Sequence, residues 1–109
     1  MNAPELKWPD DADGDVLRRM KARGFDFSQP CLIDFNVDFD NWPPPEAAMT
    51  KLEQRFPSSK ACPSTDGGGY VQFQLYEKLT YELVISIQRL VSQEMAEFDG
   101  VCESWGVLH

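Results

Sequence analysis

Two segments of this chain alternate strictly between apolar and polar residues. In the first segment, the apolar residues Ile33, Phe35, Val37 and Phe39 alternate with Asp34, Asn36, Asp38 and Asp40. In the second segment, Val71, Phe73 and Leu75 alternate with Tyr70, Gln72, Gln74 and Tyr76. Successive side chains of a strand point to opposite faces, so each segment predicts a strand with one face in a core. The other face of each strand is predicted to meet water or a partner.

Three segments with helical spacing of apolar residues can cover the apolar face of such a sheet. The first runs from Asp10 to Gly24, with aspartates at its start and basic residues in its second half, as the helix dipole favours. The second follows the prolines at 43–45 and ends before Pro57, and the third begins after Thr80, a good N-cap. Their apolar stripes are Val16, Leu17 and Met20; Ala48, Met49, Leu52 and Phe56; and Leu83, Val84, Ile87, Leu90, Val91 and Met95.

The remaining segments complete the order of elements. Residues 58–63 predict a short strand, the glycine-rich residues 64–69 predict a hairpin turn, and a last strand follows the turn at 98–100. The order is then one helix followed by β-α-β-β-α-β. We therefore predict an α+β fold, a ferredoxin-like β-α-β-β-α-β sandwich with an additional N-terminal helix. Residues 1–9 are expected to form a partly flexible tail, and residues 10–109 a single domain.

Size and charge narrow the classes of function. A chain of 109 residues builds one hydrophobic core and has no apolar run long enough for a bilayer, and from its acidic first residues we expect no secretory signal. Cytoplasmic residence is the default expectation. The net charge of −8 repels phosphate backbones and attracts basic partners, although it serves solubility equally well. No direct nucleic-acid partner and no membrane partner are expected.

The residues that carry chemistry are sparse. The only histidine is the last residue, His109, so no Ser-His or Cys-His pair is credible. Cys31, Cys62 and Cys102 form no C-x-x-C pair and are expected to be reduced, buried thiols. Asp34 would lie about 13 Å from the aspartate four residues further along its strand, too far for an acid/base pair. We expect no catalytic residue, no metal and no cofactor, and the protein is not expected to be an enzyme.

Two local patterns resemble known binding motifs and fail on particular positions. The aspartates at 11, 13 and 15 are spaced like calcium ligands, but Gly14 is misplaced and Ala22 stands where the last glutamate belongs. Residues 66–73 resemble the third-strand signature of RNA-recognition domains with this order of elements. There, Asp66 replaces the basic residue and Gly68 one stacking aromatic residue. Neither calcium nor RNA binding is therefore predicted.

A family resemblance rests on the two ends of the domain. Residues 24–30, Gly-Phe-Asp-Phe-Ser-Gln-Pro, lead into Ile33-Asp34-Phe35, and Phe98-Asp99-Gly100 is followed by Trp105-Gly106. This resembles the regulator of ribonuclease E activity B (RraB) family, with its "G-D-x-S-K-P" lead and "Y-D-G-W-G" ending, over residues from about 15 to 107. Gln29 replaces the lysine, and four residues separate Gly100 from Trp105. The resemblance implies a ferredoxin-like acidic protein that binds ribonuclease E and inhibits it without chemistry.

The surface that would bind a protein partner is predicted on the open face of the sheet. Its candidate residues are Asp34, Asn36, Asp38, Tyr70, Gln72, Gln74 and Tyr76. Aromatic anchors beside carboxylates suit an Arg-rich segment, unless the first helix or a second copy covers this face. Tyr81 and Ile85 on the third helix, with Trp8 and Trp42, are alternative exposed candidates. A ligand-sensing or dimerising domain of other function, with a homodimer as partner, remains the alternative reading, and an enzyme with an unfamiliar site a third.

Overall fold

The computed structural model describes residues 8–107, which form an α+β domain with a four-stranded sheet. The elements run in the order α1 (Ala12–Ala22), β1 (Pro30–Phe39), α2 (Glu46–Arg55), β2 (Lys60–Pro63), β3 (Gly69–Lys78), α3 (Tyr81–Met95), a 3-10 turn η1 (Ala96–Phe98) and β4 (Gly100–Val107). The types of element and their order along the chain agree with the sequence prediction.

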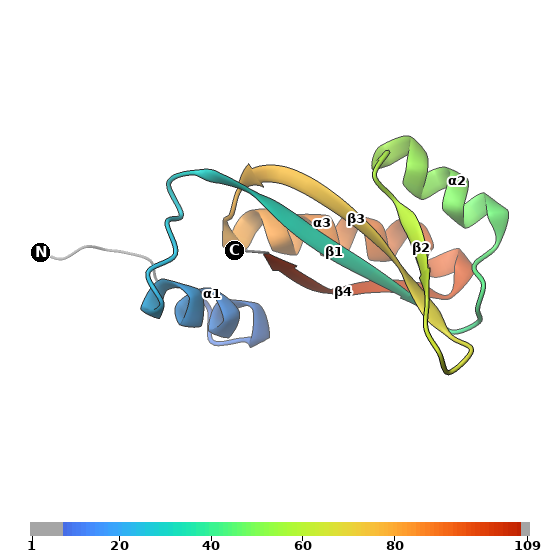
Figure 1. Cartoon of the computed structure of the whole chain (residues 1–109), viewed down its shortest axis with the longest axis horizontal. Helices are drawn as coiled ribbons and strands as arrows, with labels where there is room; N and C mark the ends of the chain where they lie inside the picture. The colour runs from blue at the N-terminus through green and yellow to red at the C-terminus, as the bar shows by residue number, and fades with distance from the viewer. Residues whose placement is uncertain (1–7, 108–109) are drawn as a thin grey trace, which may run out of the picture.

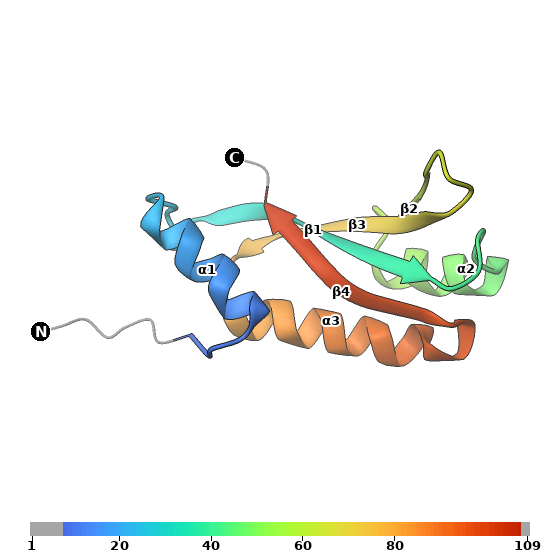
Figure 2. The same ribbon diagram turned by 90° about the horizontal axis from the view of Figure 1, so that it is seen from below.

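The sheet places the two alternating strands at its centre. Its order is β2-β3-β1-β4, and each neighbouring pair is antiparallel. In the register of β1 and β3, Asp34 lies opposite Gln74 and Asn36 lies opposite Gln72. Figures 1 and 2 show α2 and α3 together on one side of the sheet, with α1 at the end of the strands. The sheet therefore has one covered and one open face.

The core fills the space between the covered face and the helices. Phe35 and Phe73 are directly opposite on β1 and β3, and their rings stack with centroids 5.3 Å apart. Phe56, just after α2, stacks on the other side of Phe73 at 4.0 Å. The other buried apolar side chains are Leu17, Met20, Ile33, Val37, Ala48, Leu52, Val71, Leu79, Val84, Val91, Met95 and Cys102. Alternation along both strands has thus sorted apolar from polar side chains as predicted.

Helix α1 packs at the edge of this core through Leu17 and Met20, as its narrow apolar stripe predicts. Its N-cap is Asp11, whose carboxylate accepts a 2.7 Å hydrogen bond from the Gly14 N–H. After the helix, Gly24 has a positive φ of 88°, a conformation that glycine adopts without strain. The predicted tail at residues 1–9 lies mostly outside the described residues.

Both tryptophans proposed as exposed candidates are half-buried against the core, so this expectation is wrong. Trp8 packs on Phe27 with ring centroids 5.4 Å apart. The Trp42 ring lies against the start of β3, where a Cβ on Gly69 would come within 2.6 Å of it. The glycine at this position is therefore explained by the close approach of an indole as well as by the hairpin turn before it.

Candidate functional site

The open face of the sheet brings together the seven residues proposed from the sequence. Asp34, Asn36 and Asp38 lie on β1, and Tyr70, Gln72, Gln74 and Tyr76 lie on β3. Because β1 and β3 are hydrogen-bonded neighbours in register, the two rows of side chains stand next to each other. We call this surface the open face. In Figure 1 it faces the viewer, with α2 and α3 behind the strands.

Cross-strand hydrogen bonds order the centre of the open face. The Gln74 Nε2 donates to Asp34 Oδ1 at 2.6 Å, and the Gln72 Nε2 donates to Asn36 Oδ1 at 3.2 Å. Asn36 in turn donates from Nδ2 to Ser104 Oγ on β4 at 2.8 Å. These bonds link three strands and hold the amides in fixed orientations. The centre of the face is therefore a preordered polar layer.

The two ends of the open face differ in character. At one end, Asp38 is exposed and lies opposite the half-buried Tyr70. At the other end, Tyr76 is 68% exposed and lies directly opposite Leu32, which is 41% exposed. Leu32 and Tyr76 are two of three large apolar side chains that are exposed in the described part of the chain. They form an apolar pair beside the polar layer.

Two further residues of the open face, Leu32 and Ser104, are not among those predicted from the sequence. Leu32 is in phase with Asp34 along β1, so the alternation itself could have placed it on this face. Ser104 lies opposite Asn36, but an irregularity in the pairing between β1 and β4 interrupts the alternation of β4. Because such a bulge inserts an extra residue, the phase of this short strand could not be read from its sequence.

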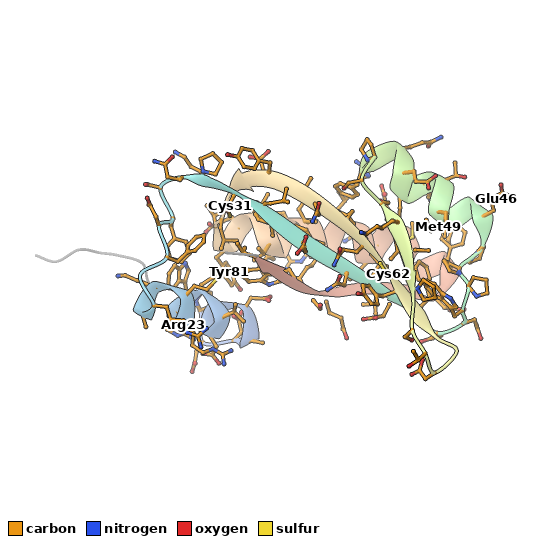
Figure 3. The ribbon with its side chains drawn as sticks, in the orientation of Figure 1. Arg23, Cys31, Glu46, Met49, Cys62 and Tyr81 are labelled. Atoms are coloured by element: carbon orange, nitrogen blue, oxygen red, sulfur yellow. The ribbon has the colours of Figure 1, made fainter. Side chains whose placement is uncertain are left out.

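The first helix lies beside the sheet, not over the open face, and its contacts are with α3 and β4. Asp13 accepts hydrogen bonds from the Trp105 Nε1 at 2.8 Å and from the Gln88 Nε2 at 3.3 Å. The Tyr81 hydroxyl donates to Asp11 Oδ2 at 2.7 Å. Figure 3 labels Tyr81 where α3 begins, close to α1. The first helix, one of the two groups that could have covered the open face, therefore packs against α3 and β4 instead.

These contacts also correct the alternative surface on the third helix. Tyr81 is half-buried and bonded to α1, and Ile85 is half-buried against the core, so neither is a free apolar side chain. The hydrogen bond to Asp11 raises the pKa of the Tyr81 hydroxyl, while it lowers the pKa of the Asp11 carboxyl. Gln88 is also buried, and its hydrogen bond to Asp13 completes the link between α1 and α3. The helical spacing of apolar residues does not predict this buried polar side chain.

The cysteines are free thiols, as expected, but they are not equally buried. Cys102 is 2% exposed, and burial raises the pKa of its thiol to about 12. Cys31 and Cys62 are half-buried, so the expectation of buried thiols is correct for Cys102 and too strong for the other two. Figure 3 shows these two far apart, at the start of β1 and on β2.

No constellation for metal or acid/base chemistry stands out in the part of the chain that the structure describes. Residues 8–107 contain no group of three or more potential metal ligands, and His109 lies beyond them. A hollow of about 540 Å³ lies between α2 and η1, away from the open face. On its rim the Lys51 ammonium pairs with Glu97 at 3.1 Å and lies 5.7 Å from the centre of the Phe98 ring. The open face is therefore suited to hydrogen bonding with another molecule.

Comparison with known proteins and family models shows the family to which the chain belongs. None of the helices among residues 8–107 has the length and apolar character needed to cross a membrane. A search of curated proteins finds no match to the chain. The family model described as regulator of ribonuclease activity B matches residues 10–107. Because this match spans nearly the whole chain, from the N-cap region of α1 to the end of β4, the protein belongs to the RraB family of regulators of ribonuclease activity.

Proposed function

We propose that this protein is a non-catalytic regulator that binds ribonuclease E in the cytoplasm and inhibits it, with the open face as its contact surface. Membership of the RraB family implies regulation of a ribonuclease. The observation that carries the choice of surface is the preordered polar layer at the centre of the sheet, which no helix of the described chain covers. The partner is thus a protein, recognised by hydrogen bonds and charge.

The chemistry of the open face favours a basic segment of the partner. Gln74 occupies Oδ1 of Asp34, so that the second carboxylate oxygen is available to an arginine or lysine. Asp38 is exposed beyond it, and tyrosines stand at both ends of the row on β3. Carboxylates beside aromatic rings are suited to guanidinium groups, which pair with the former and stack on the latter.

Inhibition follows from competition for a basic surface. The chain carries a net charge of −8, which draws it toward the positively charged regions where a ribonuclease holds RNA. A protein seated on such a region excludes the substrate without changing a covalent bond. We also interpret the architecture as ferredoxin-like, because the order β2-β3-β1-β4 is what two interleaved β-α-β units produce.

The experiment that tests this proposal is calorimetric titration with ribonuclease E from the same organism, at low and at moderate salt. Binding in the micromolar range or tighter that weakens with salt, together with slower cleavage of a model RNA, is the expected result. Absence of binding at both salt concentrations would contradict the assignment of ribonuclease E as the partner.

Charge variants test the surface separately from the partner. Replacing Asp34 by Asn and Asp38 by Lys should weaken binding by about tenfold or more, since two carboxylate contacts are lost. The matched control replaces Glu53 by Gln and Glu82 by Lys, two exposed residues on α2 and α3. It makes the same change in net charge on the helical side. Equal weakening by both pairs would argue for a general charge effect and against the open face.

A further inference from the structure

Strand β3 is longer than the strand that protects its outer edge. Strand β3 runs from Gly69 to Lys78, whereas β2 pairs with it only as far as Gln72. Figure 1 shows β2 beside one end of β3, and the arrowhead half of β3 has no strand on its outer side. The second half of β3 is therefore an edge of the sheet.

The hydrogen bonds of Gln74 show which backbone groups point outward there. Its N–H donates to Ser58 Oγ at 2.8 Å, and the same hydroxyl donates to its carbonyl oxygen at 3.2 Å. Both groups of Gln74 thus point away from β1. In an antiparallel strand, backbone groups two residues apart point the same way, so those of Tyr76 and Lys78 also face outward. Among residues 8–107, β2 does not reach these groups, and no backbone group from outside the sheet forms a hydrogen bond with them.

The opposite edge of the sheet is closed differently. On β4, the Cys102 N–H donates to Ser92 Oγ at 2.9 Å, and that hydroxyl donates to the Cys102 carbonyl at 3.2 Å. Ser92 belongs to α3, so a helix packs along this edge. A single serine hydroxyl thus binds each edge, but on β4 it belongs to a helix that packs against the strand, whereas on β3 it belongs to the turn between α2 and β2.

A second, independent feature marks the same place. The exposed pair of Tyr76 and Leu32 lies on the open face at this unpaired end of β3. A strand added outside β3 would place one of its side chains next to Tyr76 and the next one on the opposite face, near Glu77. An exposed aromatic side chain beside unpaired backbone groups is the arrangement that strand-addition sites use for affinity and for specificity.

We infer that the free edge of β3 from Tyr76 to Lys78 binds an extended segment of the partner, which adds to the sheet as a further strand. The segment carries an apolar or aromatic side chain beside Tyr76 and a basic one beside Glu77. This inference rests on the proposed function and deepens it, since it states the conformation in which the basic partner is bound.

Charge selects this occupant over a second copy of the chain. Two copies would each bring a net charge of −8 to the contact, which opposes their pairing. Lys78 also stands on the edge itself, and an edge lysine is a common guard against unspecific pairing of strands. A basic segment is attracted by the molecule as a whole and meets Glu77 at the edge.

The direct test is amide hydrogen exchange in the complex with ribonuclease E, read by NMR on this protein after dissociation. In the free protein, the Tyr76 amide should exchange rapidly, because no group among residues 8–107 accepts its hydrogen bond. On binding, its exchange should slow by about tenfold or more. The Glu77 amide, which points toward β1, is the internal control and should be protected in both states.

A backbone variant gives a second readout. Lys78→Pro removes the outward N–H but keeps Tyr76, and it should weaken binding by about three- to tenfold, the value of one hydrogen bond. Lys78→Ala removes the same side chain and keeps the N–H. It should bind as tightly as the wild type or more tightly, since a positive charge near a basic segment is lost.

The outcomes separate the inference from the function. Protection of Tyr76, with Lys78→Pro weaker than Lys78→Ala, supports strand addition. If ribonuclease E binds, but the exchange of Tyr76 is unchanged and both variants bind alike, strand addition is excluded while the regulatory function stands. If ribonuclease E does not bind the wild-type protein, the proposed function fails and strand addition by that partner fails with it.

Discussion

At the scale of the residue, the environment of each side chain decides what chemistry it can offer. The thiol of Cys102 illustrates this, because burial and the nearby carboxylates of Asp38 and Glu103 all favour its neutral form. Its pKa of about 12 leaves almost no thiolate at neutral pH. A buried, protonated thiol packs like a small apolar side chain.

We therefore predict that Cys102 does not react with Ellman's reagent in the native protein at pH 8. A variant in which Cys31 and Cys62 are replaced by Ser isolates this thiol. In this variant, the Cys102 thiol should react with the reagent and produce its colour only after denaturant is added, because only unfolding exposes the sulfur. Rapid reaction of the folded variant would show that the start of β4 opens more readily than the burial of Cys102 indicates.

The residues that could be predicted from sequence are those whose position follows from a simple period. Alternation predicts that Asp34 and Gln74 lie on the open face, because it fixes the face of each strand residue. Their mutual hydrogen bond was not predictable, since it depends on the register between β1 and β3. Ser104 was missed for the same reason, because the irregular pairing of β4 is set by tertiary contacts.

At the scale of the element, the docking of α1 depends on a few polar contacts with α3 and β4. Asp11 is both the N-cap of α1 and the acceptor for the Tyr81 hydroxyl. The Tyr81 hydroxyl, and after it the Gly14 N–H, hold the pKa of the Asp11 carboxyl below its usual value of 3.8. The same contact raises the pKa of Tyr81 above its usual 10.0.

This linkage predicts a pH dependence with two limits. A lowered carboxyl pKa contributes stability that is present above about pH 4 and is lost as the pH falls through the folded-state value. A raised phenol pKa contributes stability that is present below about pH 10 and is lost as the pH rises through the folded-state value. The difference in Tm between wild type and Tyr81→Phe should be largest between these limits.

Thermal melts of both proteins from pH 2.5 to pH 11 measure that difference. Asp11→Asn keeps a side-chain cap but removes the charge, and it should show a smaller dependence on acid than the wild type. If the difference between wild type and Tyr81→Phe were constant across the range, the contact between α1 and α3 would not be coupled to the ionisation of either partner.

The order of elements was predictable, whereas the partial length of β2 was not. Alternation and helical stripes identify β1, β3 and α3, and Thr80 caps α3 as predicted, accepting a hydrogen bond from the Leu83 N–H at 3.0 Å. Residues 58–63 have a weak pattern, and β2 occupies only Lys60–Pro63 of them. The length of β2 depends on where the chain passes from α2 into the sheet. That is a tertiary constraint, which local sequence patterns do not contain.

The stacked rings between β1, β3 and the end of α2 are expected to be the most sensitive part of the core. Phe73 has Phe35 on one side and Phe56 on the other, and it is fully buried. Phe73→Ala should lower the free energy of unfolding by about 3–5 kcal/mol, since it removes a buried ring from between two others. Urea unfolding followed by circular dichroism measures this change, and Phe73→Leu, which retains most of the volume, should cost clearly less.

At the scale of the whole molecule, charge and architecture together set how a partner is met. The excess of 18 acidic over 10 basic residues acts at a distance, before any particular contact forms. In the complex that we propose, the open face and the free edge of β3 act at contact, where hydrogen bonds give the orientation. Sequence composition predicts the first of these properties directly, whereas the second needs the order of the strands.

Association with a basic partner should accordingly be fast at low salt and slower at moderate salt. Stopped-flow mixing with ribonuclease E should show an association rate that falls by about tenfold between about 0.01 M and 0.15 M salt, because the Debye length shrinks from about 30 Å to about 8 Å. The dissociation rate should change less. A rate of association that does not respond to salt would show that net charge plays no part in the encounter.

The link between α1 and the rest of the domain has a practical consequence. Asp13 binds the indole N–H of Trp105, so the environment of one tryptophan depends on whether the first helix is seated. Indole emission is sensitive to the polarity and hydrogen bonding around the ring. Replacing Trp8 and Trp42 by phenylalanine would leave Trp105 as a single intrinsic fluorophore, and the protein would then report the seating of its own N-terminal helix without an attached dye.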